Sequence, residues 1–250
     1  MYKNSAETLC YLRKLQENTA DLLRDEINLF ILPSFTSLYE AAKDPDTKFL
    51  QLGAQNIAYE EEGQYTGDIS ARMLEENDIR LVMLGHSERR HVFGETDYEV
   101  NKKVHIAVKH NFTALLCVGE TETQKTFGVA REVLRQQIKI GFHQLPPTAS
   151  KNLWVAYEPV WSIGVKGTPA SAAYAETMHQ TIKNCLYEIF GQKSDDIPVL
   201  YGGSVNLDNC EELICQDSID GLFVGRAAWD ADNFDVLIRK ALKAHRANGN

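Results

Sequence analysis

A glutamate follows an apolar segment in the stretch AYEPVWSIGVKG, residues 156–167. Leu153–Ala156 reads as a buried strand, and Glu158 stands where that strand gives way to a loop containing Pro159, Trp161 and two glycines. Most such acids are solvated loop residues. Here the flanking aromatic side chains would keep the carboxylate out of bulk water, and the glycines would let the following segment move. We therefore interpret Glu158 as a candidate general base beneath a mobile flap.

A histidine occupies a comparable place after another apolar run. His86 follows LVMLG and precedes Ser87–Arg90, where we expect a helix to begin. A lone histidine there is more often an ordinary polar residue at a helix start. Because a helix N-terminus disfavours imidazolium, we expect His86 to stay neutral and to donate a hydrogen bond to a carbonyl group. For Glu88, a role in the site and a structural ion pair with Arg89 are equally good interpretations.

The elements that must position these residues alternate along the chain. Short apolar runs predict strands at residues 27–32, 49–52, 80–84, 113–118, 153–157, 197–201 and 219–224. Amphipathic stretches predict helices at residues 5–18, 71–77, 99–109, 130–140, 171–190, 209–216 and 233–247. This alternation indicates βαβ units on a parallel sheet. With no linker or break in composition, we expect one domain, 1–250.

Polar and glycine residues distinguish a barrel from a doubly wound sheet. They follow several predicted strands, at 85–88, 117–120, 158, 202–204 and 225–226. Function gathered at many strand ends favours a (β/α)8 TIM barrel. The glycine-bearing turns after the last two strands are where backbone amides of a barrel usually bind phosphate, although glycine is common at any tight turn.

Composition excludes several classes of protein. The 250-residue chain carries a net charge of -9 and no basic stripe, which argues against nucleic acid as a partner. No apolar run approaches the roughly 20 residues of a membrane span, and the N-terminus does not resemble a signal peptide. The five cysteines are scattered without CxxC spacing, which predicts reduced thiols in a cytoplasmic protein.

Four of these segments together resemble the signature blocks of the triosephosphate isomerase family. They are GHSERR (85–90), CVGE (117–120), AYEPVW (156–161) and YGGSV (201–205), and they occur in the family's order. The resemblance implies that Glu158 is the base, that His86 polarises a carbonyl and that Glu88 is an acid close to the site. It also implies phosphate-binding backbone at Gly164, Ser204, Gly225 and Arg226.

The resemblance further implies a mobile lid over 159–169 and a homodimer. The segment from Asn56 to Thr66 resembles the loop that docks into a second subunit, with Thr66 at its tip. The substrate would be a small phosphorylated sugar, isomerised through an enediol without a metal or other cofactor.

Two departures from the family bear on this interpretation. Where triose enzymes have two glycines this chain has Gly225-Arg226, and that segment and the lid more closely resemble the family branch that isomerises L-erythrulose 1-phosphate. The family's first strand, which ends in an Asn and a catalytic lysine, has no match in the given residues. Either that strand precedes Met1 in the protein or the chain is a defective barrel, and we expect the first, because an open barrel would leave two strand edges unpaired. If the chain from Met1 is already fully active, Lys3 and Arg226 are the first cations to test as a replacement for the lysine.

Three functions therefore stay open from the sequence. The first is an isomerase of L-erythrulose 1-phosphate or, alternatively, of dihydroxyacetone phosphate and glyceraldehyde 3-phosphate, placed in carbohydrate metabolism. The second is a non-catalytic phosphosugar-binding barrel, favoured by the missing lysine. The third is a purely structural protein.

Overall fold

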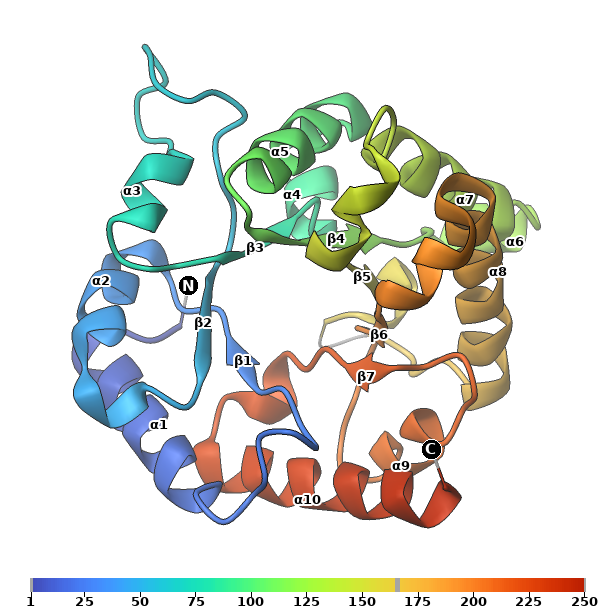
Figure 1. The fold of residues 1–250 in the computed structure, drawn as a ribbon. Coiled ribbons are helices and arrows are strands. Elements are labelled where there is room, and N and C mark those ends of the chain that lie inside the picture. Colours follow the sequence, from blue (N-terminus) through green and yellow to red (C-terminus); the bar gives the residue numbers. More distant parts are fainter. Residues whose placement is uncertain (1, 165–166, 250) are drawn as a thin grey trace.

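The computed structural model describes residues 2–164 and 167–249, and its strands form one curled parallel sheet (Figure 1). Strands that are neighbours along the chain are also paired in the sheet, in the order β1-β2-β3-β4-β5-β6-β7. The strands are β1 (Phe30–Ile31), β2 (Gln51–Ala54), β3 (Leu81–Leu84), β4 (Thr113–Val118), β5 (Leu153–Tyr157), β6 (Val199–Tyr201) and β7 (Gly221–Leu222). Six of these strands lie within runs predicted from the sequence, and β2 overlaps its predicted run, 49–52, but extends two residues beyond it.

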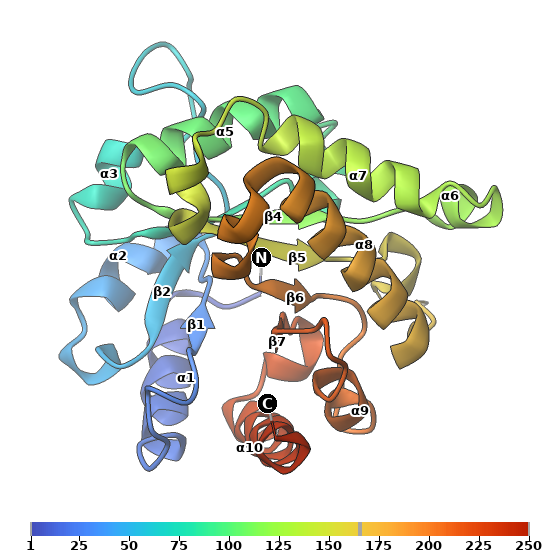
Figure 2. The same cartoon turned by 45° about the vertical axis from the view of Figure 1, so that its right-hand side comes forward.

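Helices surround the sheet in a ring, which Figures 1 and 2 show from two directions. They are α1 (Ser5–Asn18), α2 (Phe35–Lys43), α3 (Ala71–Glu75), α4 (Ser87–His91), α5 (Asp97–Lys109), α6 (Glu122–Thr126), α7 (Ala130–Gly141), α8 (Ala172–Phe190), α9 (Cys210–Ile214) and α10 (Ala231–Asn248). The architecture is that of a TIM barrel, as predicted. The short helices α2 and α6 were missing from the sequence prediction.

Alternation along the strands divides the apolar residues into an inner and an outer core. In β4, Leu115 and Cys117 point into the barrel, where they pack with Met83 and Ala156. Leu116 and Val118 belong to the larger cluster between sheet and helices. Because successive side chains of a strand point to opposite faces, a strand of this barrel must be apolar throughout.

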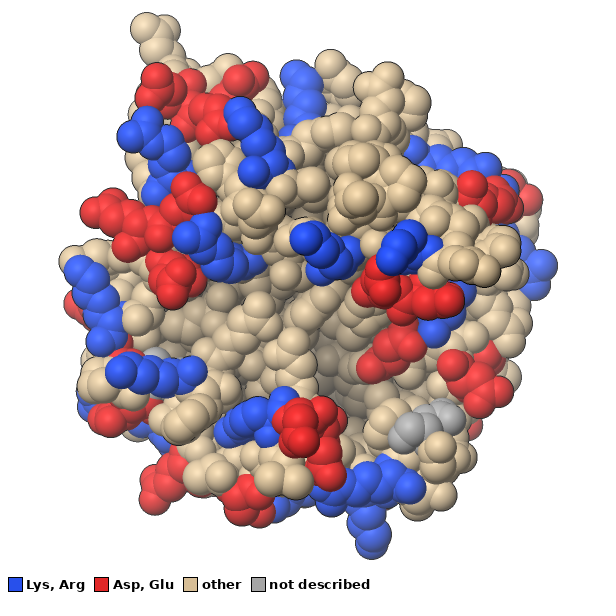
Figure 3. Space-filling model, in the orientation of Figure 1, with Lys and Arg blue, Asp and Glu red and all other residues tan. Residues whose placement is uncertain are grey.

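The sheet has an open edge between its first and last strands. No pairing joins β1 to β7 within residues 2–164 and 167–249. A groove of about 290 Å³ lies between these strands and α10, and its walls include Phe30, Trp154 and Leu222. Figure 3 shows a central hollow with uncharged walls and charges of both signs around it. The described strands thus agree with the prediction of a barrel lacking one strand.

Candidate active site

The two residues first singled out from the sequence are in direct contact. Glu158 directly follows β5, and His86 lies between β3 and α4. The Oε1 atom of Glu158 is 3.0 Å from Nε2 of His86, and its Oε2 accepts a hydrogen bond of 3.1 Å from the backbone N–H of Ser87. The Glu158 side chain is only 4% exposed, against 20% for His86. A nearly dry carboxylate therefore faces an imidazole that opens toward solvent.

The backbone around Glu158 is fixed by neighbouring strands. Its N–H donates to the carbonyl of Val118 at 2.7 Å, and the N–H of Gly202 donates to the carbonyl of Tyr157 at 2.7 Å. A Cβ atom on Gly119 would lie 1.8 Å from the carbonyl oxygen of Glu158. Glycine is thus required at position 119 so that β4 can end beside the base.

Arg90 holds the ends of β3 and β4 together beneath the site. Its Nε donates to the carbonyl of Gly85 at 2.6 Å and its Nη2 to that of Cys117 at 3.2 Å, while Nη1 pairs with Asp97. Gly85 adopts a φ of 69°, which favours glycine. The arginine in GHSERR therefore positions the backbone that precedes His86. Sequence reasoning assigned it no role, because it acts through contacts with another strand.

Two effects determine the protonation of His86. Burial lowers its pKa, but the Glu158 carboxylate, with a smaller contribution from Glu88, raises it, so that the pKa lies above its ordinary value. The N–H of Glu88 points at Nδ1 over 3.3 Å, which leaves the proton of a neutral ring on Nε2. The sequence argument for a neutral ring considered only the helix. It omitted the Glu158 carboxylate, which favours imidazolium.

Glu88 lies at the edge of the site. Its side chain is 74% exposed, and its Oε2 is 3.9 Å from Nδ1 of His86. Of the two alternatives for Glu88, the ion pair with Arg89 does not form, because Arg89 pairs with Glu95 at 3.1 Å. Glu95 also bonds Lys103, and both of these side chains are buried. The structural charge cluster therefore forms without Glu88, which remains near the imidazole.

The predicted phosphate-binding positions come from three loops. Ser204 follows β6, and its carbonyl accepts from Nδ2 of Asn209 at 2.8 Å. Arg226 follows Gly225 and β7, and its Nη2 donates to the carbonyl of Gly164 at 2.6 Å. The structure thus brings the loops after β5 and β7 into contact. Of the expected lid, residues 159–169, positions 165 and 166 lie outside the described residues.

A buried glutamate that sequence reasoning left without a role supports the loop after β5. Glu120 is fully buried and accepts hydrogen bonds from Tyr157 at 3.0 Å, Trp161 at 2.7 Å and Tyr174 at 2.9 Å. The available signal was its place at the end of a strand, together with nearby aromatic residues that can donate. Glu120 therefore joins β5, its loop and α8 around one carboxylate.

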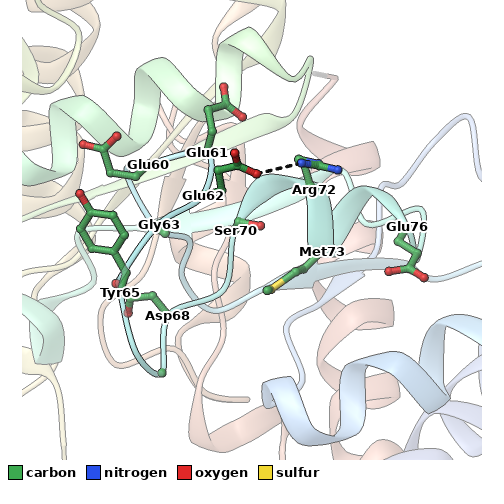
Figure 4. Close-up of a pocket in the computed structure, with 12 residues that line it drawn as sticks. Glu60, Glu61, Glu62, Gly63, Tyr65, Asp68, Ser70, Arg72, Met73 and Glu76 are labelled. Carbon is green, nitrogen blue, oxygen red and sulfur yellow. Dashed lines mark hydrogen bonds and ion pairs between the residues drawn. The ribbon is translucent and has the colours of Figure 1, made fainter.

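The loop expected to bind a second subunit projects from the barrel between β2 and α3 (Figure 1). At its base, Asn56 accepts a hydrogen bond of 2.9 Å from Lys103, and Thr66 is exposed. A hollow of about 730 Å³ lies between the loop and α3, with several acidic residues and the Arg72–Glu62 ion pair in its wall (Figure 4). Neither His86 nor Glu158 lines it, so this hollow is separate from the candidate active site.

Within residues 2–164 and 167–249, no three His, Cys, Asp or Glu side chains are grouped so that they could hold a metal ion. No helix in the same ranges is long and apolar enough to cross a membrane.

A parallel β/α barrel whose strand ends bring a buried carboxylate against a histidine defines an enzyme of the TIM-barrel class. The family model described as triosephosphate isomerase matches residues 1–241. The chain belongs to the triosephosphate isomerase family, and it is an isomerase.

Relatives and a solved structure agree with this assignment. The chain is 43% identical to the L-erythrulose-1-phosphate isomerase of Rhizobium etli, over 99% of this chain and 92% of the relative. It is 45% identical to the protein of that name from Rhizobium meliloti, over 96% and 94%. Triosephosphate isomerase from Bartonella henselae superposes with a TM-score of 0.85 at 32% identity, covering 96% of this chain and 95% of that one.

Proposed function

We propose that the protein interconverts a short phosphorylated ketose and the isomer in which the carbonyl has moved to the neighbouring hydroxyl-bearing carbon, with L-erythrulose 1-phosphate as the preferred ketose. The observation that carries the chemistry is the dry carboxylate of Glu158 held 3.0 Å from the imidazole of His86. The preference for four carbons is supported by relatives that are 43% and 45% identical and are named L-erythrulose-1-phosphate isomerase.

In the proposed mechanism, Glu158 removes a proton from the hydroxyl-bearing carbon next to the carbonyl. The electrons of that C–H bond form a carbon–carbon double bond, and the carbonyl oxygen takes the proton on Nε2 of His86, which gives an enediol. Return of the proton from Glu158 to the neighbouring carbon, with transfer of the hydroxyl proton back to His86, completes the isomerisation. Each group ends in its starting state, and side chains suffice, so we propose no cofactor.

Substrate binding would also set the protonation of His86. The contact with Glu158 raises the pKa of His86. A carbonyl group placed between the two side chains would separate them and so weaken that effect. Burial and the N–H of Glu88 at Nδ1 would remain, and both favour the neutral ring that donates from Nε2.

The phosphate group would bind at the loops after β5, β6 and β7. We assign its backbone ligands to Gly164, Ser204, Gly225 and Arg226, because exposed amides at such loops can bind an anion on a protein of net negative charge. Glu88 is proposed as an acid close to the imidazole.

The wider assignments are also proposals. We infer one domain and a homodimer in which the loop from Asn56 to Thr66 contacts the second subunit, supported by its projection from the barrel (Figure 1). A cytoplasmic location is supported by five scattered cysteines. The reaction belongs to carbohydrate metabolism, in erythritol breakdown for the four-carbon substrate or in glycolysis for the three-carbon one.

A side-by-side assay tests the function. We expect a higher kcat/KM for L-erythrulose 1-phosphate than for dihydroxyacetone phosphate. Equal kcat/KM values, or a higher value for dihydroxyacetone phosphate, would instead indicate a triosephosphate isomerase. The family's catalytic lysine has no match in the given residues, so a phosphosugar-binding barrel without turnover is the competing function. Solvent-proton exchange into bound dihydroxyacetone phosphate separates the two, because a binder would catalyse none.

A further inference from the structure

The side chain of Arg226 connects two of the loops that surround the site. The residue begins the short turn Arg226–Ala228 after β7, and its side chain is exposed. Its Nη2 donates a hydrogen bond of 2.6 Å to the carbonyl of Gly164, 62 positions earlier in the chain. The guanidinium group therefore contacts Gly164, the residue whose backbone N–H we assign to phosphate binding.

Among residues 2–164 and 167–249, few other contacts could fix the orientation of Gly164. It adopts a φ of 90°, it is exposed, and no atom of these residues outside its chain neighbours lies within 4 Å of the position of a Cβ. Its carbonyl also accepts a longer hydrogen bond, of 3.3 Å, from the N–H of Gly167. The shorter and charge-assisted bond from Arg226 is thus the stronger restraint on Gly164.

The charge of Arg226 has no acidic partner nearby. In the described parts of the chain, no Asp or Glu lies within ion-pair distance of its guanidinium group, which makes the single hydrogen bond to Gly164. Guanidinium has five N–H donors in a planar fork that matches the oxygens of a phosphate. Four donors therefore remain for a ligand bound between the loops.

We infer that the Arg226 side chain is a ligand of the substrate's phosphate dianion. One donor holds Gly164, and the remaining fork binds the phosphate oxygens. The inference extends the proposed function, which gave Arg226 only a backbone role, and it rests on that function for the phosphosugar. In this role the Arg226 side chain adds a positive charge to a phosphate site whose other proposed ligands are backbone amides.

The experiment measures binding of inorganic phosphate by titration calorimetry, together with steady-state kinetics. Arg226→Gln removes the charge, Arg226→Lys keeps it, and Arg131→Gln removes one charge from an exposed position on α7 as the matched control. We expect Arg226→Gln to weaken phosphate binding about tenfold or more and to raise KM with little change in kcat. Arg226→Lys should lose less than Arg226→Gln, and Arg131→Gln should bind as the parent does.

A purely structural role gives a different pattern. If Arg226 only held the loop, Arg226→Lys and Arg226→Gln would alter phosphate binding equally, and that result overturns the inference. Unchanged phosphate binding in Arg226→Gln overturns it too, whatever the turnover. Phosphate binding that depends on Arg226 in a protein without isomerase activity would keep the inference and reject the proposed function. Thermal melts check folding, and Arg226→Met replaces the Gln variant if that variant is unfolded.

Discussion

Oε1 of Glu158 lies 3.0 Å from Nε2 of His86, so the proposed base contacts the proposed electrophile directly. The two residues follow β5 and β3, and parallel strands bring their carboxyl ends to one edge of the barrel. Because one proton donor and one acceptor already face each other, a substrate carbonyl must separate them before either group can act on it.

Replacing Glu158 by Gln should remove most turnover and leave the fold intact, because the amide keeps the volume but cannot accept a proton from carbon. We expect kcat to fall by about 10² to 10⁴-fold. Binding of inorganic phosphate should change little. Glu132→Gln, at an exposed position on α7, is the matched control. A loss smaller than about tenfold would contradict the role of Glu158 as base.

The pKa of His86 should fall in the same Glu158→Gln variant. The carboxylate raises this pKa, whereas burial, which lowers it, remains after the substitution. A raised folded-state pKa contributes stability that is present below about pH 6.5 and lost as the pH rises through the folded value. NMR titration of the ring should show the shift in His86 and none in exposed His143. Identical titrations of His86 in both proteins would reject the coupling.

The fold could be predicted from local signals, because the strands are largely apolar on both faces and each long helix has a stripe of apolar side chains along one side. The ends of β4 and β5 could also be predicted, because a polar residue follows each apolar run, as Glu158 does after β5. Contacts between distant loops were not readable. The bond of Arg226 to Gly164 and the anchoring of Gly85 by Arg90 depend on how the barrel curls, which no local pattern encodes.

Trp161→Phe should destabilise the protein by about 1.5 to 3 kcal/mol, the range for a hydrogen bond to a charged group. The indole N–H donates to the buried carboxylate of Glu120 at 2.7 Å, and Phe keeps the ring packing without the donor. Urea unfolding measures the change. Trp229→Phe is the control, because Trp229 is 41% exposed and should change stability by less than about 0.5 kcal/mol. Equal losses in the two variants would show that the bond to Glu120 contributes nothing.

His179 should make the protein labile to acid. The ring is fully buried against Tyr157 and Tyr201, and its Nδ1 lies 3.1 Å from the carbonyl of Ser218. Burial lowers the pKa of His179 to about 3, with a further lowering by Lys183 and against the opposing bond to Ser218. Below about pH 6.5 the unfolded chain therefore binds a proton that the folded protein excludes, so stability falls as the pH falls.

This single residue should cost about 2 kcal/mol between pH 7 and pH 5, and on the order of 5 kcal/mol by pH 3. Other groups also bind protons in acid, so the quantity to compare is how steeply the free energy of unfolding changes with pH in each protein. Urea unfolding at pH 7 and pH 5 should show a smaller loss in His179→Phe than in the parent, whatever the absolute stability of the variant. His179→Gln serves the same purpose if the Phe variant is unfolded, and exposed His143→Gln should keep the parent's slope. A parental slope in His179→Phe would mean that the ring takes up its proton in the folded protein at ordinary pH.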